Sequence, residues 1–548
     1  MLKPGDIAIV SGARTPFGRY CGKLKDFTAQ ELAAIAAKGA IARSGIDPKE
    51  FDHAVFGNAQ QTSGDALYGA RHVGLRAGLP IETPALTVNR LCGSGMQSLV
   101  SAAQMIQTDE AKVVLAGGME AMSQAPFVIR GRDGFTLAPG GKLEDSLMVA
   151  LLDTYCGLYM ANTAELYGEQ QGITRQAQDE FALRSQQRAD AAYKEGRIQE
   201  ELVPVPLRNH KGEATGESLT EDDHRRPQTT MEGLTKLRPA FGKNGTVTAG
   251  NASGIVDGAA AVVLMSLDEV RKRNMEPLGR IVSWGVAGVE PKLMGRGPVP
   301  ATKIALQKAG LSLDYIDLIE VNEAFAAQYL SVEKELGLDR EKVNVNGGAI
   351  ALGHPLGATG TRLVITLLYE LRRRKKKYGL ATACIGGGQG IAMVVESMSW
   401  LFCCGYTRAK TNSPQRTQGT IEAQPRYLSR RSRMRLVVFV LGMILFTAVL
   451  LLSVLYQSHQ GFMVSIALQV FPILFTRDHL KGRRWFNPVW LAWSGITFLA
   501  AGWLQTSEGL RVEPVFSSFG PGYLIMAVLA VVWPKWYYGR QDESPKVD

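Results

Sequence analysis

The spacing of hydrophobic positions in residues 1–397 changes repeatedly between a strand pattern and a helix pattern. Short runs of β-branched and small apolar residues predict strands at residues 7–10, 54–57, 87–89 and 113–116. Longer stretches, with small or apolar residues three or four positions apart, predict helices at residues 28–44 and 94–107.

A similar rhythm returns later in this stretch. It predicts strands at residues 279–288, 318–322, 342–344, 380–385 and 391–396, and helices at 300–309, 323–336 and 357–376. Strands that alternate with helices indicate an α/β fold. We therefore predict two similar α/β halves, residues 1–270 and 271–397, with an irregular polar insertion over residues 120–248.

The pattern changes again after residue 397. Residues 436–456 are apolar and uncharged, and 21 helical residues can cross a hydrocarbon core of roughly 30 Å. Shorter apolar stretches follow at residues 461–475, 488–504 and 522–533. They predict a C-terminal α-helical transmembrane region of about four helices. For the shorter stretches, a re-entrant or buried helix is the alternative.

Charge divides the chain in the same place. Residues 398–548 carry 16 Lys and Arg against 7 Asp and Glu, whereas residues 1–397 carry 45 against 44. The isoelectric point of about 9.2 therefore gives no indication that the large part binds nucleic acid, and we expect no nucleic-acid partner.

Basic residues lie before the first apolar stretch and between the second and third. By the positive-inside rule, the large part faces the cytoplasm, behind a polar basic linker at 398–435. The helices then occupy residues 436–534, and residues 535–548 form a cytoplasmic tail. Six irregularly spaced cysteines give neither a disulfide framework nor a zinc motif, so we predict no metal site and a reducing compartment. The expected localisation is a membrane.

Four local motifs carry candidate chemistry. The first is Asn-Arg-Leu-Cys-Gly-Ser-Gly-Met at residues 89–96, where Cys92 lies between a predicted strand and a predicted helix. The N–H groups and dipole at a helix N-terminus favour a thiolate, which predicts a reactive cysteine. A small buried cysteine beside a glycine turn is the alternative.

The other three motifs also lie on loops at strand ends or helix starts. His354 stands within a glycine-rich run at residues 346–360, Cys384 precedes Gly386 at a strand end, and Asn322 begins a helix. A histidine can deprotonate a thiol, and an amide can orient a water or a carbonyl group. Each of these residues alone has an ordinary structural alternative, such as a turn or a helix cap.

These four motifs, in this order and spacing, resemble the thiolase family from about residue 7 to residue 396. Residues 117–123 and 249–254 are similar to further signatures of that family. The resemblance implies a duplicated thiolase fold with five layers (αβαβα) and a loop domain over residues 120–248. It also implies a homodimer or homotetramer.

The resemblance further implies roles for the motif residues. Cys92 would be the nucleophile that takes an acyl group from coenzyme A, and His354 would activate it. Cys384 would be the acid and base at the α-carbon. Asn322, through a water, and His354 would hold the enolate oxygen. The N–H groups of Cys92 and Gly386 would hold the thioester oxyanion.

The implied substrates are coenzyme A and acyl-CoA, with no permanently bound cofactor. By resemblance, Ser253 lies near the pantetheine, Arg226 near the nucleotide and Met160 in the substrate loop. One residue departs from the family pattern: Tyr159 stands where short-chain biosynthetic members usually have a histidine. This favours a 3-ketoacyl-CoA longer than acetoacetyl-CoA. The expected reaction is condensation of two acetyl-CoA, or thiolytic cleavage of 3-ketoacyl-CoA, by an enzyme tethered to a membrane.

Three alternatives remain open. A ketoacyl synthase would show a second histidine in place of Cys384. A non-catalytic lipid-transfer or membrane scaffold protein would tend to lack one of the three reactive groups, which are all present here. The family pattern ends at Ser397, so the join at Met398 is also compatible with two adjacent chains merged into one. The basic run at residues 372–377 is expected to be a solvated helix end, with anionic lipid headgroups as the alternative ligand.

Overall fold

The computed structural model describes residues 6–129, 143–209, 211–242 and 244–398. The chain divides into two units, residues 1–410 and 411–548, and the described residues all belong to the first. The predicted linker, transmembrane helices and cytoplasmic tail lie outside the described residues. Among the helices that are described, none is both long and apolar enough to cross a membrane.

A mixed sheet runs through the described part of the chain. Its strands follow the order β14-β15-β16-β13-β1-β12-β5-β3-β4, with the short β2 paired to β12. The strand bounds are β1 Ile7–Arg14, β2 Gly18–Arg19, β3 His53–Asn58, β4 Ala85–Val88, β5 Val113–Ala121, β12 Val256–Ser266, β13 Gly279–Gly288, β14 Leu318–Val321, β15 Tyr378–Ile385 and β16 Gln389–Ser397.

The sheet is built from two halves that repeat the same order and strand directions. In the first half β3 is parallel to β5, β5 is antiparallel to β12, and β12 is antiparallel to β1. In the second half β14, β15, β16 and β13 repeat these relations in turn. The halves join where β1 pairs antiparallel with β13. The prediction of two similar α/β halves therefore agrees with the observed topology.

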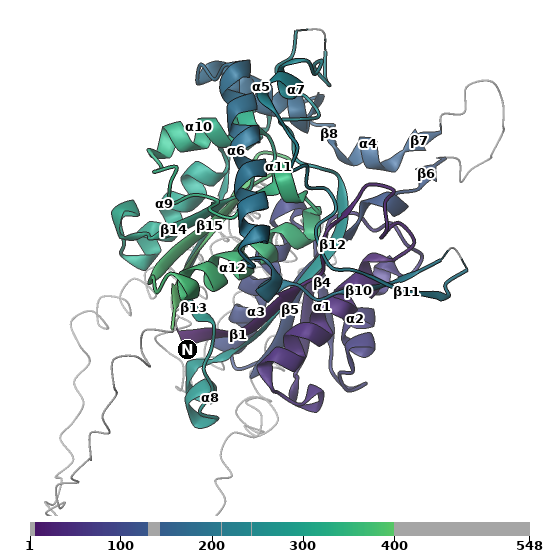
Figure 1. The fold of residues 1–548 in the computed structure, drawn as a ribbon. Coiled ribbons are helices and arrows are strands. Elements are labelled where there is room, and N and C mark those ends of the chain that lie inside the picture. Colours follow the sequence, from purple (N-terminus) through teal and green to yellow (C-terminus); the bar gives the residue numbers. More distant parts are fainter. Residues whose placement is uncertain (1–5, 130–142, 210, 243, 399–548) are drawn as a thin grey trace, which may run out of the picture. The chain divides into compact units, whose positions relative to one another are not determined.

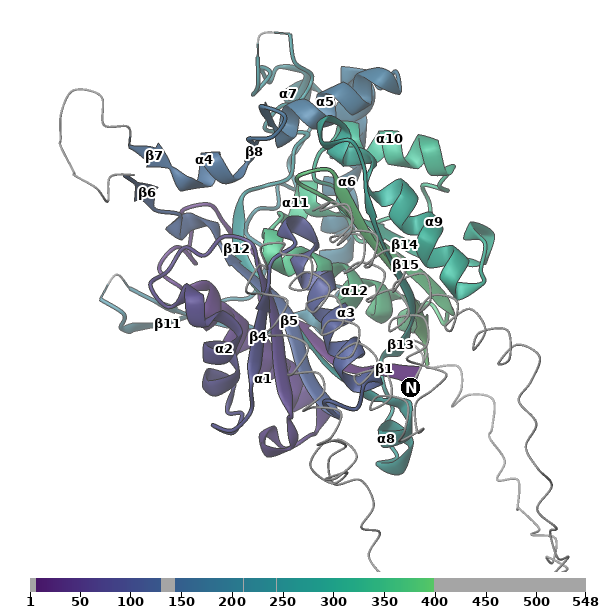
Figure 2. The same cartoon turned by 180° about the vertical axis from the view of Figure 1, so that it is seen from behind.

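Helices lie on both faces of each half (Figures 1 and 2). Apolar residues of α1 (Ala29–Ser44) and α2 (Gly69–Ala77) form a core with the outer face of the first half. Helices α3 (Ser94–Gln107) and α12 (Leu356–Arg373) fill the space between the halves. Helices α9 (Pro298–Ala309) and α10 (Ala326–Leu336) cover the outer face of the second half.

Strand β12 shows why these strands read as continuous apolar runs. Ala261 and Val263 belong to the core under α1, whereas Ala260 and Val262 belong to the core with α3 and α12. Both faces of the strand are buried, so the alternation of polar and apolar residues disappears. The result is five layers of alternating helices and strands.

Helix α1 shows how local sequence fixes element ends. Thr28 accepts a hydrogen bond from the Glu31 N–H, and the Glu31 side chain accepts one from the Thr28 N–H, which completes a capping box. Gly45 ends the helix in the left-handed conformation (φ 68°), which glycine adopts without steric cost. The prediction of residues 28–44 is therefore correct to within the cap residue.

The predicted irregular insertion is wrong in part, because it contains well-formed helices. The two longest are α5 (Met160–Gln170) and the 20-residue α6 (Arg175–Lys194). Two shorter helices are α4 (Ser146–Ala150) and α7 (Met231–Thr235). Three short strand pairs also lie here: β6 (Phe127–Val128) with β7 (Glu144–Asp145), β8 (Leu152–Asp153) with β9 (Leu158–Tyr159), and β10 (Val205–Arg208) with β11 (Ala214–Leu219). Helix α6 buries Gln178, Asp179 and Ser185 beside its apolar residues, which masks its helical period.

The second half differs from the prediction at one helix start and at one strand. The helix expected to begin at Asn322 begins at Ala326, as α10, because Phe325 has an extended backbone (φ −149°, ψ 145°). Residues 342–344 form only an isolated bridge, between Ile319 and Val343. Two short helices, α8 (Leu267–Lys272) and α11 (Ala349–Leu352), complete the described α-helices. The predicted basic helix end at residues 372–377 pairs with carboxylates: Arg373 with Glu200, and Arg374 with Glu370.

Candidate active site

Helices α3 and α12 hold equivalent places in the two halves and bring the candidate residues together. Cys92 lies in a single 3-10 turn, Leu91–Gly93, directly before α3. His354 lies two residues before α12 begins. The helices can pack closely because Gly95 has no side chain. A Cβ at this position would lie only 2.6 Å from the Gly357 carbonyl oxygen. The packing of the two helices therefore sets the separation of Cys92 and His354.

The turn that carries Cys92 is held by its neighbours in an unusual conformation. Leu91 has a positive φ of 46°, which is uncommon for a residue with a side chain. Its N–H donates to Asn89 Oδ1 (2.9 Å), and its carbonyl accepts from Ser94 Oγ (2.7 Å). Arg90 adds a hydrogen bond to Gln389 Oε1 (3.0 Å), beyond the Cys384 strand. These contacts fix the direction of the Cys92 side chain.

The expected thiolate character of Cys92 is wrong for the free protein. Burial raises the pKa of the Cys92 thiol to about 11, although the N–H groups of Gly386 and of Cys92 itself act to lower it. The charge of Glu120 raises it further. Removal from water thus outweighs the helix N-terminus, and the thiol is protonated at neutral pH.

His354 is held in one tautomer. Its Nδ1 lies 2.6 Å from Thr359 Oγ1, and that hydroxyl donates to the Pro355 carbonyl at 3.0 Å. The hydroxyl must therefore accept from an Nδ1–H, which makes Nε2 the acceptor nitrogen of the ring. Asn322 Nδ2 donates to Nε2 at 3.3 Å. Burial, followed by the charge of Arg362, lowers the pKa of His354 to about 3, so the ring is neutral.

Cys384 ends β15 with a fully buried side chain. Burial raises the pKa of its thiol well above the ordinary value, and charge on Cys92 raises it further. Gly386 follows in the turn between β15 and β16, and its N–H faces the Cys92 sulfur. Two protonated thiols and a neutral imidazole therefore meet at one point.

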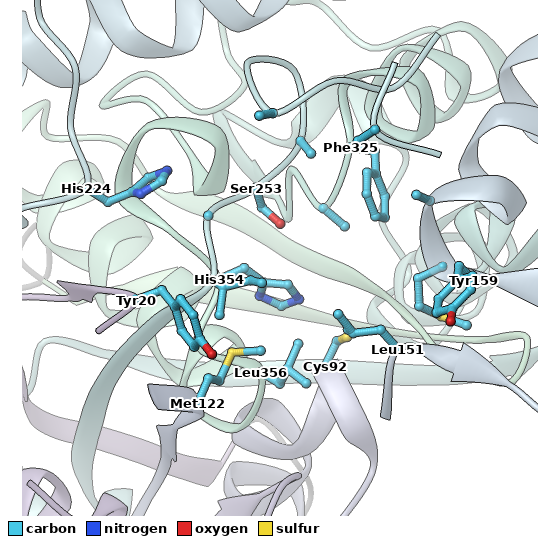
Figure 3. Close-up of a pocket in the computed structure, with 18 of the residues that line it drawn as sticks. Tyr20, Cys92, Met122, Leu151, Tyr159, His224, Ser253, Phe325, His354 and Leu356 are labelled. Carbon is cyan, nitrogen blue, oxygen red and sulfur yellow. The ribbon is translucent and has the colours of Figure 1, made fainter. Parts of the chain in front are cut away.

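These groups face one cavity of about 520 Å³. Figure 3 shows Cys92, His354 and Ser253 around it, with Tyr20 and His224 on one side and Tyr159 and Phe325 on the other. The predicted residues that line it are Cys92, Met160, Arg226, Ser253, His354, Cys384 and Gly386. The remaining predicted residue, Asn322, lies behind His354 with a fully buried side chain, and its Oδ1 makes no hydrogen bond to any described residue.

An exposed arginine lies where loop 222–226 borders the cavity. Arg226 is exposed, and its N–H donates to Gln186 Oε1 at 2.9 Å. Asp222 holds the loop in place, because it accepts two hydrogen bonds from the fully buried Arg14 (2.7 and 2.8 Å). Burial, followed by the charge of Arg226, lowers the pKa of His224 to about 4. This border suits an anionic group.

Three residues in or beside the site were not predicted from the sequence. Thr359 is one helical turn beyond the His354 loop, so its contact with the ring depends on where α12 begins. Glu120 lies in a recognised signature, but only the tertiary structure shows its partners. His224 lies two residues from Arg226 and lines the same cavity.

Comparison with known proteins decides the family. The family model described as thiolase, N-terminal domain, matches residues 7–268, and the one described as thiolase, C-terminal domain, matches residues 275–397. The chain belongs to the thiolase family.

Thiolases of known activity are similar to this chain. The human mitochondrial 3-ketoacyl-CoA thiolase is 55% identical over 392 residues, which cover 71% of this chain and 98% of the relative. An acetyl-CoA acetyltransferase of Cupriavidus necator is 47% identical over 393 residues, which cover 71% and 99%. This thiolase is therefore an acyltransferase.

Solved thiolase structures share the fold. The crystal structure of the human mitochondrial 3-ketoacyl-CoA thiolase in complex with CoA has a TM-score of 0.69 and 54% identity, and the match covers 71% of this chain and 98% of that one. The Bacillus anthracis acetyl-CoA acetyltransferase has a TM-score of 0.70 and 43% identity, with 72% and 99% covered.

Proposed function

We propose that this thiolase cleaves 3-ketoacyl-CoA with coenzyme A, and catalyses the reverse condensation, through an acyl group held on Cys92. The observation that carries the proposal is the single cavity that joins Cys92, His354 and Cys384. Tyr159, at 5.7 Å from Phe241 between ring centres, gives this cavity an aromatic wall. Such a wall favours acyl chains longer than that of acetoacetyl-CoA.

In the first half-reaction the Cys92 sulfur attacks the 3-keto carbon. Because the thiol has a raised pKa and His354 a lowered one, the proton passes to His354 Nε2 as the carbon–sulfur bond forms. The N–H groups of Cys92 and Gly386 hold the resulting oxyanion. The bond between C2 and C3 then breaks, which leaves the acyl group on Cys92.

The departing fragment is the enolate of acetyl-CoA. The new Nε2–H of His354 and a water on Asn322 hold its oxygen, and Cys384 donates its proton to the α-carbon. In the second half-reaction coenzyme A attacks the acyl-Cys92 thioester and gives its proton to the Cys384 thiolate. The Cys92 sulfur leaves and recovers the proton from His354. A covalent intermediate of this kind predicts ping-pong kinetics.

Binding of coenzyme A is assigned along the same cavity. Arg226 lies at the loop that borders it and is the candidate contact for the nucleotide phosphates. Ser253 and Met160 are the candidate contacts for the pantetheine and the acyl chain. We also propose a homodimer or homotetramer.

The experiment on the enzyme compares thiolysis of acetoacetyl-CoA and of its C8 homologue. The proposal predicts that wild type cleaves both, with a higher kcat/KM for C8. It predicts that Cys92→Ser and Cys384→Ala each lower kcat by more than about 10³-fold, since each removes a reacting group. Wild type without activity on either substrate would contradict the proposal.

We further propose that residues 398–548 tether the enzyme to a membrane with its catalytic part in the cytoplasm. The proposal rests on the apolar stretches and the basic flanks of that segment. Fractionation of cells that express the full chain tests it. Activity that sediments with membranes and resists carbonate washing is expected. Activity found only in a shorter soluble species would contradict the tether but leave the enzymatic proposal intact.

A further inference from the structure

Glu120 is a buried carboxylate close to the site that the proposed reaction does not use. It lies near the end of β5 with a side chain that is 0% exposed. Oε1 accepts from Asn58 Nδ2 (2.7 Å) and the Gln60 N–H (2.8 Å). Oε2 accepts from the Ala59 N–H (3.1 Å) and the Gly357 N–H (2.7 Å). Four donors thus converge on one carboxylate, which satisfies its acceptor capacity.

Three of these four partners lead to the nucleophile. Residues 58–60 donate three of the four hydrogen bonds to Glu120, and the Ala59 carbonyl in turn accepts from Asn89 Nδ2 (3.0 Å). Asn89 Oδ1 accepts from the Leu91 N–H, at the turn that carries Cys92. We call residues 89–93 the nucleophile loop. It is therefore tied to Glu120 through one intervening segment.

The fourth partner leads to the histidine. Gly357 lies three residues after His354, and we call residues 353–357 the histidine loop. The backbones meet here without space for side chains, because a Cβ on Gly357 would lie 2.3 Å from the Met119 carbonyl oxygen. A Cβ on Gly118 would lie 1.8 Å from the Gly357 carbonyl oxygen. The histidine loop thus rests directly on the end of β5.

Because the two halves repeat the same topology, Glu120 has an equivalent residue in the second half. In the first half Asn58 pairs with Met119, so Glu120 is one residue beyond that pair. In the second half Val321 pairs with Thr382, which brings Asn322 level with Ala383 and places Cys384 one residue beyond. Asn58 and Glu120 are therefore the counterparts of Asn322 and Cys384. Asn58 and Glu120 lie at the start of α12, where Glu120 accepts from the Gly357 N–H. Asn322 and Cys384 lie at the active site, beside the start of α3.

We infer that Glu120 is a positioning residue that holds the nucleophile loop and the histidine loop at the separation that catalysis requires. This inference rests on the proposed function of Cys92 and His354. Displacement of a reacting group by about 1 Å can lower a rate about 100-fold. The residues that face the substrate elsewhere in the cavity, such as Ser253 and Phe325, make no hydrogen bond to Glu120.

The test is Glu120→Gln, assayed as kcat and KM in thiolysis. Glutamine keeps the shape but turns one oxygen into a donor, so two of the four N–H groups lose their acceptor. We expect kcat to fall about 100-fold, while KM changes by less than about threefold. The matched control is Asp52→Asn at the other end of β5, where one carboxylate oxygen accepts from the N–H groups of Lys112 (2.8 Å) and Val113 (2.9 Å). Its kcat should stay at the wild-type value.

Asn89→Ala keeps the inference testable if Glu120→Gln does not fold. It breaks only the link to the nucleophile loop, and we expect formation of acyl-Cys92 to slow about tenfold. Wild-type kcat in the folded variants, with lower melting temperatures alone, would overturn the inference. An inactive wild type would instead overturn the proposed function.

Discussion

At Cys92, burial raises the pKa of the thiol by more than the N–H groups near the helix N-terminus lower it. The thiol keeps its proton, with a pKa raised to about 11, and the neighbouring His354 stays neutral, with a pKa lowered to about 3. Two neutral partners avoid the side reactions of a free thiolate. They also require that the proton moves during the attack rather than before it.

Alkylation of the free enzyme tests the protonation state of Cys92. A thiol with a pKa near 11 is almost fully protonated at pH 7, and its thiolate fraction rises about tenfold for each pH unit. The rate of carboxamidomethylation at Cys92, followed by mass spectrometry, should therefore rise about 100-fold from pH 7 to pH 9. The control is an unstructured cysteine peptide with a thiol pKa of about 8.5, whose rate should rise only about 25-fold over the same range and level off above about pH 9.5. A plateau between pH 6 and pH 8 would instead reveal a preformed thiolate–imidazolium pair.

Thr359 provides a second test, because it fixes the tautomer of His354. In Thr359→Val the Nδ1–H loses its acceptor in a buried site, which costs about 1–3 kcal/mol, and the ring can turn its lone pair away from Cys92. We expect kcat to fall about tenfold or more, and Thr359→Ser to restore most of it because the hydroxyl returns. An unchanged kcat in the valine variant would show that the tautomer needs no such support.

At the scale of elements, the crossing of β5 and α12 depends on glycine. Gly118 and Gly357 let two backbones touch where any side chain would collide. This contact positions the start of α12, and with it the histidine loop. Helix α3 meets α12 in the same manner through Gly95 and Gly360.

Gly118→Ala tests this crossing. The added methyl group would meet the carbonyl oxygen and carbon of Gly357 at 1.8 and 2.7 Å, and both are backbone atoms that cannot turn aside. Overpacking of this kind lowers the free energy of unfolding by about 1–3 kcal/mol or more. The control is Gly64→Ala, where no atom lies within 4 Å of the new methyl group, and chemical denaturation compares the two. Equal stability of both variants would contradict the account.

Sequence patterns predicted elements best where one period dominates. The bounds of α3 and β13 agree with the predicted ranges. Helix α6 was not predicted because it buries the polar Gln178 and Asp179 beside its apolar residues, which interrupts the apolar stripe. The motif residues could be predicted, since glycine marks a loop that approaches a ligand. The raised pKa of Cys92 could not, because burial depends on the second half of the chain.

At the scale of the whole molecule, duplication builds the site. Each half alone offers a helix that starts at a strand end, with either a cysteine or a histidine before it. Only the packing of α3 on α12, between two sheets that join at β1 and β13, brings Cys92, His354 and Cys384 to one cavity. Among the described residues, those that line the catalytic cavity all lie between Arg19 and Gly386.

The central claim is that Cys92 carries the acyl group. The most direct test is to mix the full-length enzyme with a 3-ketoacyl-CoA in the absence of free coenzyme A, quench with acid, and identify the modified peptide by mass spectrometry. We expect one acyl group on the peptide that contains Cys92, removed on addition of coenzyme A and absent in Cys92→Ser. An acyl group on Cys384 instead, or turnover without any acylated cysteine, would contradict the account.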